Sequence, residues 1–217
     1  GGFPPDAGDL EIQVFEQSEG DGYTCRKIEY GVEPGLKVPA YVLIPKETGG
    51  DSAAADRNGR RPAVIALHGH GCGVKDIIGL NPDGTPRTGD PGYQKDFALE
   101  LARRGFVVAA PELLGFGETR LAEHRDAEPH ANSCSRLAPN LLLLGRTLIG
   151  LRVHQTRRLL DALLTLPEVD PQRIGIMGIS GGGMVATFTA ALDDRIQAAV
   201  ISGYVSRFRG SIMAVPH

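Results

Sequence analysis

Four short apolar runs that alternate with helical patterns constrain the fold of this chain more than any other feature. The runs cover residues 62–68, 106–110, 173–179 and 196–202. Continuous apolar runs of this length, bounded by turn residues, are typical of strands buried on both faces of a parallel sheet. Because the crossover between parallel strands is usually a helix, the alternation predicts an α/β fold, with a mostly parallel sheet and helices on both faces.

The helices expected between these runs cover residues 90–104, 140–166 and 181–192. Asp90 and Pro91 are residue types that favour the N-cap and the first helical position, so they predict the start of the first helix. The Gly- and Pro-containing stretches before the first two helices are expected to be long loops.

The most apolar stretch of the chain, residues 141–151, lies in the second of these helices. Its leucines recur at helical spacing, which predicts a stripe that faces the core. Gly145, Arg146 and Gly150 interrupt the stretch, and it is shorter than the ~20 residues that a membrane span requires. We therefore expect a core helix and no membrane anchor.

The beginning of the chain has a different pattern, typical of antiparallel ribbons. Residues 10–16, 23–30 and 37–44 alternate in the manner of half-buried strands, and Gly- and Pro-containing turns separate them. These segments predict antiparallel strands that precede the parallel part of the sheet.

Composition and charge fit one globular domain that acts on a small molecule. Hydrophobic residues make up 41% of the chain, enough to build a core, so we expect residues 1–217 to form a single domain. Within it, the antiparallel strands fall in residues 1–45 and the α/β core in residues 62–202. The 23 basic residues nearly balance the 26 acidic ones, and we expect neither a nucleic-acid nor a membrane partner.

The cysteines and the N-terminal residues bear on the cellular compartment. Three cysteines are too few for a disulfide framework, which favours a reducing compartment. The first residues lack the basic and apolar regions of a signal peptide. We expect a cytoplasmic protein, and the sequence leaves open whether it forms a homo-oligomer.

Residues 178–182 (GISGG) match the G-x-S-x-G pattern of a nucleophile elbow. The motif follows a predicted strand and opens a predicted helix, which is the setting that the chemistry of the elbow requires. Ser180 is therefore the candidate nucleophile, and the N–H of Gly181 is a candidate donor to a developing oxyanion. The alternatives are a Gly-rich turn that serves only packing and a phosphate-binding turn of a dinucleotide fold.

A second motif, HGHG at residues 68–71, directly follows the first apolar run. This is where an elbow-type hydrolase places its second oxyanion donor, so the backbone N–H of His70 is the candidate. Two alternatives stay open. His68, His70 and Cys72 could bind a metal, or the two imidazoles could only bond to the loop backbone.

The order of these features resembles the α/β-hydrolase superfamily, in particular the branch of acetyl xylan esterase and cephalosporin deacetylase-like enzymes, related to dienelactone hydrolases. The matching segments are residues 68–71, 98–106, 111–118, 159–163, 167–175, 178–183 and 190–196. The resemblance implies an α/β-hydrolase fold and a Ser180 that attacks an ester carbonyl, while His70 and Gly181 contribute backbone amides. A serine at position 180 favours the esterases over dienelactone hydrolase itself.

A serine hydroxyl needs a histidine base and a carboxylate that orients it, and in this fold both follow the serine. After Ser180 the chain offers Asp193, Asp194 and His217. The two aspartates are better explained by helix termination and solvation. We expect the C-terminal strand–helix units to be absent, and the triad acid and histidine to come from a remaining C-terminal segment or a second chain. An abbreviated site with His217 as the base is the alternative.

Further candidates precede the elbow, and for each a structural or surface role is the better interpretation. They are His124, His130 and His154, and, as substrate contacts in a solvated loop, Arg120, Arg125 and Arg136.

The resulting hypothesis is a serine carboxylesterase that hydrolyses short acyl esters, such as acetylated sugars, without a metal or an organic cofactor. The alternatives are a non-catalytic binding protein on a hydrolase scaffold and a serine peptidase or amidase.

Overall fold

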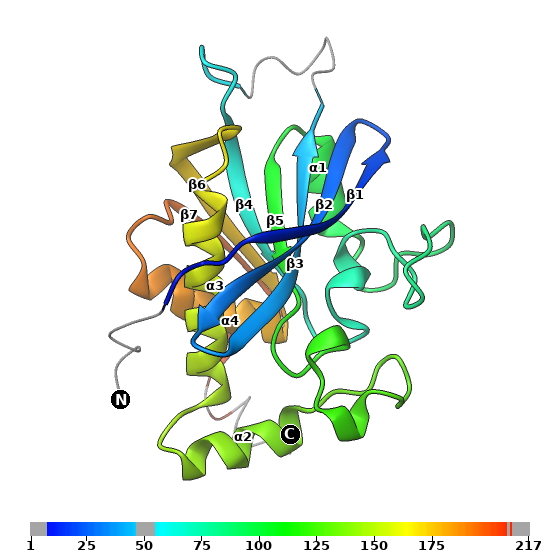
Figure 1. Cartoon of the computed structure of the whole chain (residues 1–217), viewed down its shortest axis with the longest axis vertical. Helices are drawn as coiled ribbons and strands as arrows, with labels where there is room; N and C mark the ends of the chain where they lie inside the picture. The colour runs from blue at the N-terminus through cyan, green and yellow to red at the C-terminus, as the bar shows by residue number, and fades with distance from the viewer. Residues whose placement is uncertain (1–7, 47–54, 208, 210–217) are drawn as a thin grey trace.

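Seven strands form one sheet at the centre of the molecule (Figure 1). The computed structural model describes residues 8–46, 55–207 and 209. The strands are β1 (Gln13–Gly20), β2 (Tyr23–Glu33), β3 (Leu36–Pro45), β4 (Arg61–Leu67), β5 (Val107–Pro111), β6 (Val169–Ile179) and β7 (Ala198–Ser202). Their order across the sheet is β1-β2-β3-β5-β4-β6-β7.

The sheet has an antiparallel and a parallel part. Strands β1, β2 and β3 pair antiparallel, and β3 joins β5 in the same manner. Strands β5, β4, β6 and β7 are parallel to one another. The carboxyl ends of the parallel strands therefore meet at one edge of the sheet, where ligands bind in open α/β sheets.

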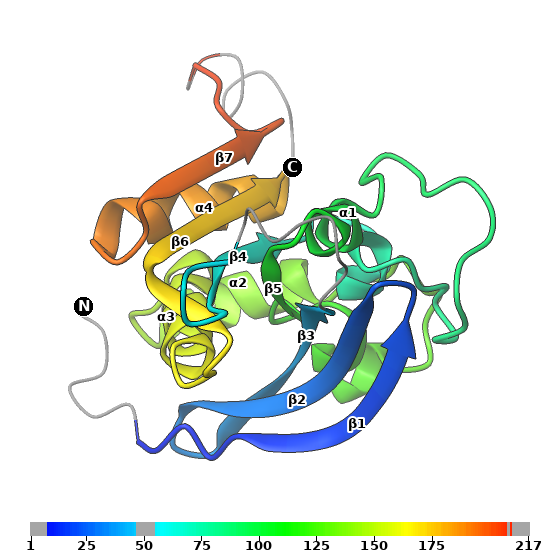
Figure 2. The same ribbon diagram turned by 90° about the horizontal axis from the view of Figure 1, so that it is seen from above.

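Helices cover both faces of this sheet (Figure 2). They are α1 (Phe97–Arg103), α2 (Cys134–Leu143), α3 (Leu148–Leu163) and α4 (Gly181–Leu192), with 3-10 turns η1 (Gly73–Ile77), η2 (Gly117–Thr119) and η3 (Ala122–His124). Buried residues of α3 and α4 pack with Ile65 and Ile176 on one face. Those of α1 pack with Ala66 and Val108 on the other. The expected α/β architecture, a mostly parallel sheet with helices on both faces and antiparallel strands at the beginning of the chain, is thus confirmed.

The start of the first predicted helix was wrong, since α1 begins at Phe97 and not at Asp90. The carboxylate of Asp90 instead accepts the N–H of Gly92 in a local turn. Lys95 and Asp96 have positive φ angles of 53° and 47°, a left-handed conformation that interrupts a right-handed helix. The end near Gly105 was predicted correctly.

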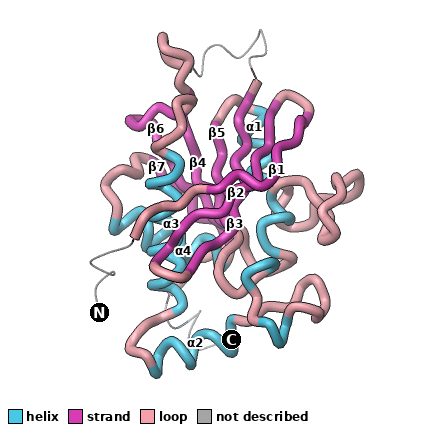
Figure 3. The backbone as a smooth tube through the Cα atoms, in the orientation of Figure 1, coloured by secondary structure: helices cyan, strands magenta, loops and turns pink. Residues whose placement is uncertain are grey.

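The second predicted helix is two helices, α2 and α3. They meet at Gly145, whose φ is +69°, and the hydroxyl of Thr147 caps α3 by accepting the N–H of Gly150 at 3.0 Å. Only α3 is a core helix. Leu143 and Leu144 of the apolar stretch are 87% and 74% exposed, because α2 lies apart from the sheet (Figure 3) and packs on α3.

Asp193 ends α4 as expected, but its carboxylate is buried and not solvated. Arg195 donates to both of its oxygens at 2.7 Å, and Arg157 donates to Oδ2 at 3.0 Å. These hydrogen bonds, those of Arg195 first, lower the pKa of Asp193 to about 2. The neighbouring Asp194 is exposed.

The change Asp193→Asn is expected to lower the free energy of unfolding at pH 7 by about 2 kcal/mol. A carboxyl whose pKa is lowered in the folded state stabilises it above the ordinary pKa near 3.8, and this stabilisation is lost as the pH falls to about 2. Urea unfolding at pH 7 and pH 3 measures the effect, with Asp194→Asn as the control. Equal stability of both variants at pH 7 would contradict the buried ion pair.

No helix in the described part of the chain is long and apolar enough to cross a membrane.

Candidate active site

Ser180 occupies a sharp turn between β6 and α4. Its φ of 53° is positive, which is costly for a residue other than glycine and is often found at functional sites. The Ser180 N–H donates to the carbonyl of Ser202 at 2.8 Å, and the Ser180 carbonyl accepts the N–H of Met184 at 3.0 Å. The serine therefore has the strand–turn–helix setting predicted for the elbow.

The glycines of the motif allow three backbone segments to approach closely. A Cβ atom on Gly178 would lie 2.2 Å from the carbonyl oxygen of Gly182, and one on Gly182 would lie 2.1 Å from that of Leu67. No side chain fits at these distances. The glycines thus let α4 pack directly on the end of β4, and they fix the position of the elbow between them.

The loop after β4 lies against the elbow, as its sequence predicts. A Cβ on Gly69 would lie 3.2 Å from Cβ of Ser180, and one on Gly181 would lie 3.3 Å from Nδ1 of His70. The exposed ring of His70 packs edge-on against buried Phe116, with 5.2 Å between ring centroids. The structure thus brings His70 and Gly181 next to Ser180.

Three side chains hold this loop by accepting its backbone N–H groups. Oε1 of Gln94 accepts from Gly69 at 2.7 Å, Oδ2 of Asp76 from Cys72 at 2.7 Å, and Oε1 of Glu112 from Val74 at 3.0 Å. Gln94 and Glu112 are almost completely buried. The shape of the candidate oxyanion loop is therefore set by its own Asp76 and by side chains from two other loops.

Tyr93 is a site residue that the sequence did not indicate. Its hydroxyl donates to the carbonyl of His70 at 2.5 Å, and it would lie 2.5 Å from a Cβ on Gly69. Its side chain is 56% exposed beside the elbow. No motif marks this tyrosine, because its role depends on the contact between the loop before α1 and the loop after β4.

His68 has a packing role in the interior. Its Nε2 accepts the N–H of Leu113 at 3.1 Å, so Nδ1 carries the proton and donates to the carbonyl of Gly69 at 2.8 Å. Sγ of Cys72 instead lies 3.2 Å from Nδ1 of His130. Within residues 8–46, 55–207 and 209, no three metal-ligating side chains converge.

The remaining candidates lie away from the elbow or support loops. His154 is buried and bonds to the carbonyl of Val32 at 2.9 Å, and burial lowers the pKa of its imidazole. Nδ1 of His124 lies 2.9 Å from Oγ of Ser133. The side chain of Arg136 pairs with Glu123 at 3.5 Å. These contacts agree with structural or surface roles.

In the part of the chain that the structure describes, Ser180 is not hydrogen-bonded to a histidine base, and no histidine–carboxylate pair is aligned with it as in a triad. The Ser180 hydroxyl makes no hydrogen bond to any of these residues. Asp193 is bound by two arginines, and His217 lies outside the described residues.

A comparison with protein families adds to this geometry. A model of the Abhydrolase family matches residues 2–217. The chain belongs to the Abhydrolase family.

The most informative relatives are longer than this chain. "Putative hydrolase YtaP" of Bacillus subtilis (strain 168) is 28% identical over 200 residues, which are 90% of this chain and 58% of the relative. The chain therefore spans little more than half of that protein.

Solved structures share the fold and bear out the resemblance noted in the sequence. One described as a putative acetyl xylan esterase from Bacteroides fragilis NCTC 9343 has a TM-score of 0.73 at 21% identity, over 91% of this chain and 48% of the other. Acetyl xylan esterase 1 from Thermoanaerobacterium sp. JW/SL YS485 has a TM-score of 0.62 at 22% identity, over 95% and 56%.

Proposed function

We propose that the protein is a serine carboxylesterase that hydrolyses short acyl esters, such as acetylated sugars, through an acyl-enzyme. The single observation that carries the proposal is the strained Ser180 between β6 and α4, with the His70 loop packed against it. The names of the two structural neighbours support an acetyl ester as the substrate.

In this mechanism Oγ of Ser180 attacks the ester carbonyl carbon, and a histidine base takes the hydroxyl proton. The carbonyl oxygen becomes an oxyanion, which the N–H groups of His70 and Gly181 stabilise. Collapse of the tetrahedral intermediate expels the alcohol, which receives the proton, and leaves an acyl group on Ser180. Water then hydrolyses this ester by the same steps. We expect the base and its carboxylate partner to lie outside the described residues.

A binding protein on a hydrolase scaffold is the second candidate. The observation that favours it is the lack of a hydrogen bond between the Ser180 hydroxyl and any residue that the structure describes. A serine peptidase or amidase would share the elbow, and it differs by cleaving amide as well as ester substrates.

A fluorophosphonate probe tests the proposal, because only an activated serine hydroxyl displaces its fluoride. We expect the native complete protein to gain one phosphonyl group, which peptide mapping places on Ser180, and heat-denatured protein to gain none. Native protein that stays unlabelled would favour the binding protein. Hydrolysis of p-nitrophenyl acetate but not of the matching anilide separates an esterase from an amidase.

A further inference from the structure

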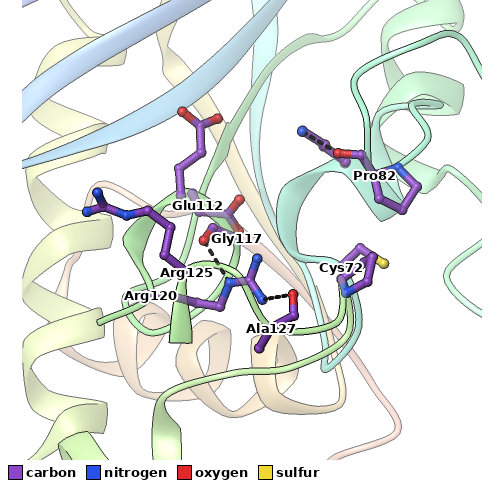
Figure 4. A pocket seen from close by; sticks show the side chains of 10 residues that line it. Cys72, Pro82, Glu112, Gly117, Arg120, Arg125 and Ala127 are labelled. Carbon is purple, nitrogen blue, oxygen red and sulfur yellow. Dashed lines mark hydrogen bonds between the residues drawn. The ribbon is translucent and has the colours of Figure 1, made fainter. Parts of the chain in front are cut away.

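A cavity of about 430 Å³ lies between the loops that follow β4 and β5 (Figure 4). Its walls include Cys72, Lys75, Glu112, Glu118, Arg120 and Arg125. Cys72 belongs to the same loop as His70, and Glu112 holds that loop through Val74. The cavity therefore shares the His70 loop and one of the side chains that support this loop with the candidate site.

Three positively charged side chains in these walls have N–H donors that make no hydrogen bond to the described residues. Nζ of Lys75 donates to the carbonyl of Pro82 at 2.7 Å, which uses one of three donors. Arg120 donates through Nε to Gly117 and through Nη1 to Glu128, both to backbone carbonyls (Figure 4 shows the contact with Gly117). The side chain of Arg125 is exposed and bonds to no residue that the structure describes. None of the three charges is paired with a carboxylate of the described chain.

The two carboxylates of the walls are, in contrast, already engaged. Glu118 accepts two hydrogen bonds from Lys27, at 2.7 and 2.8 Å. Oε1 of Glu112 accepts the N–H of Val74 at 3.0 Å. Burial raises the pKa of the Cys72 thiol to about 11, so the sulfur stays uncharged near pH 7. The cavity is left with positive charge that an anion would neutralise.

We propose that this cavity binds the carboxylate of a sugar acid in the substrate, that is, a uronic-acid unit next to the esterified one. The proposal rests on the proposed esterase function and names its substrate class. A guanidinium presents paired N–H groups that match the two oxygens of a carboxylate. The volume is within the range of small-ligand sites, and a uronic acid supplies both a negative charge and hydroxyl groups for the charged side chains in the walls.

Binding of D-glucuronate to the complete protein, measured by isothermal titration calorimetry, tests the proposal without any catalytic step. We expect saturable binding of D-glucuronate that weakens as NaCl is added, since partly exposed ion pairs are screened by salt. D-glucose, which lacks the carboxylate, is expected not to bind. Equal binding of the two sugars, or tighter binding of inorganic phosphate than of D-glucuronate, would overturn the assignment.

The change Arg125→Gln is expected to weaken D-glucuronate binding about tenfold, because it removes charge-assisted hydrogen bonds to the carboxylate. Arg136→Gln is the matched control, because Arg136 is also exposed but does not line the cavity. Circular dichroism verifies that both variants fold. Unchanged affinity in Arg125→Gln would overturn the proposal. Fluorophosphonate labelling of Ser180 is a separate measurement, so failure of the carboxylate site and failure of the esterase proposal are distinguishable.

Discussion

The change Ser180→Ala is expected to lower kcat for p-nitrophenyl acetate by about 10⁴- to 10⁶-fold in the complete enzyme. Without the hydroxyl no acyl-enzyme forms, and only the oxyanion donors and substrate binding continue to assist attack by water. The backbone around the elbow is held by the Ser180 N–H and carbonyl, which alanine retains. The measurement is steady-state hydrolysis at saturating ester, with burst kinetics as a check for the acyl-enzyme.

The matched control for this loss is Ser135→Ala, an exposed serine on α2. Its variant should keep the activity of the unmodified enzyme. If Ser180→Ala and Ser135→Ala hydrolyse the ester equally well, the activity does not depend on the elbow, and the nucleophile must be sought elsewhere.

The parallel half of the sheet could be predicted because each of its strands carries its own signal. A strand buried on both faces is apolar at every position, so residues 62–68 and 173–179 stand out whatever surrounds them. The elbow could be predicted for the same reason, because the strand, Ser180 and the glycines are adjacent in the sequence. The ends of the strands were predicted less accurately than their positions. Strand β6 begins at Val169 and β1 extends to Gly20, each a few residues beyond the predicted limit.

Features that depend on distant partners could not be predicted. The burial of Asp193 requires Arg157, which lies in a different helix. No motif predicts that Gln94 and Glu112 support the His70 loop. The role of Glu112 depends on the sheet order that sets β5 beside β4, and that of Gln94 on the fold of the loop before α1. Gly145 is visible in the sequence, but the helical periodicity of the leucines continues across it. The positive φ of Gly145 and the extended backbone of Thr147, which separate α2 from α3, appear only in the structure.

The change Gly182→Ala is expected to lower the free energy of unfolding by about 3 kcal/mol. Its Cβ would lie 2.1 Å from the carbonyl oxygen of Leu67 and 2.5 Å from that of His68. Both atoms belong to the backbone at the end of β4, so no side-chain rotation can relieve the overlap. The helix α4 would have to move away from the sheet, and Ser180 would move with it. Urea unfolding followed by circular dichroism measures the loss.

Gly89→Ala is the control for this substitution, because a Cβ on Gly89 meets no atom within 4 Å and its φ is not positive. That variant should differ from the unmodified protein by less than about 0.5 kcal/mol. A Gly182→Ala variant as stable as Gly89→Ala would mean that α4 is not held this close to β4. Gly69 and Gly181 allow similarly close contacts, with Ser180 and with His70. The close approach of the His70 loop to Ser180 would then be in question as well.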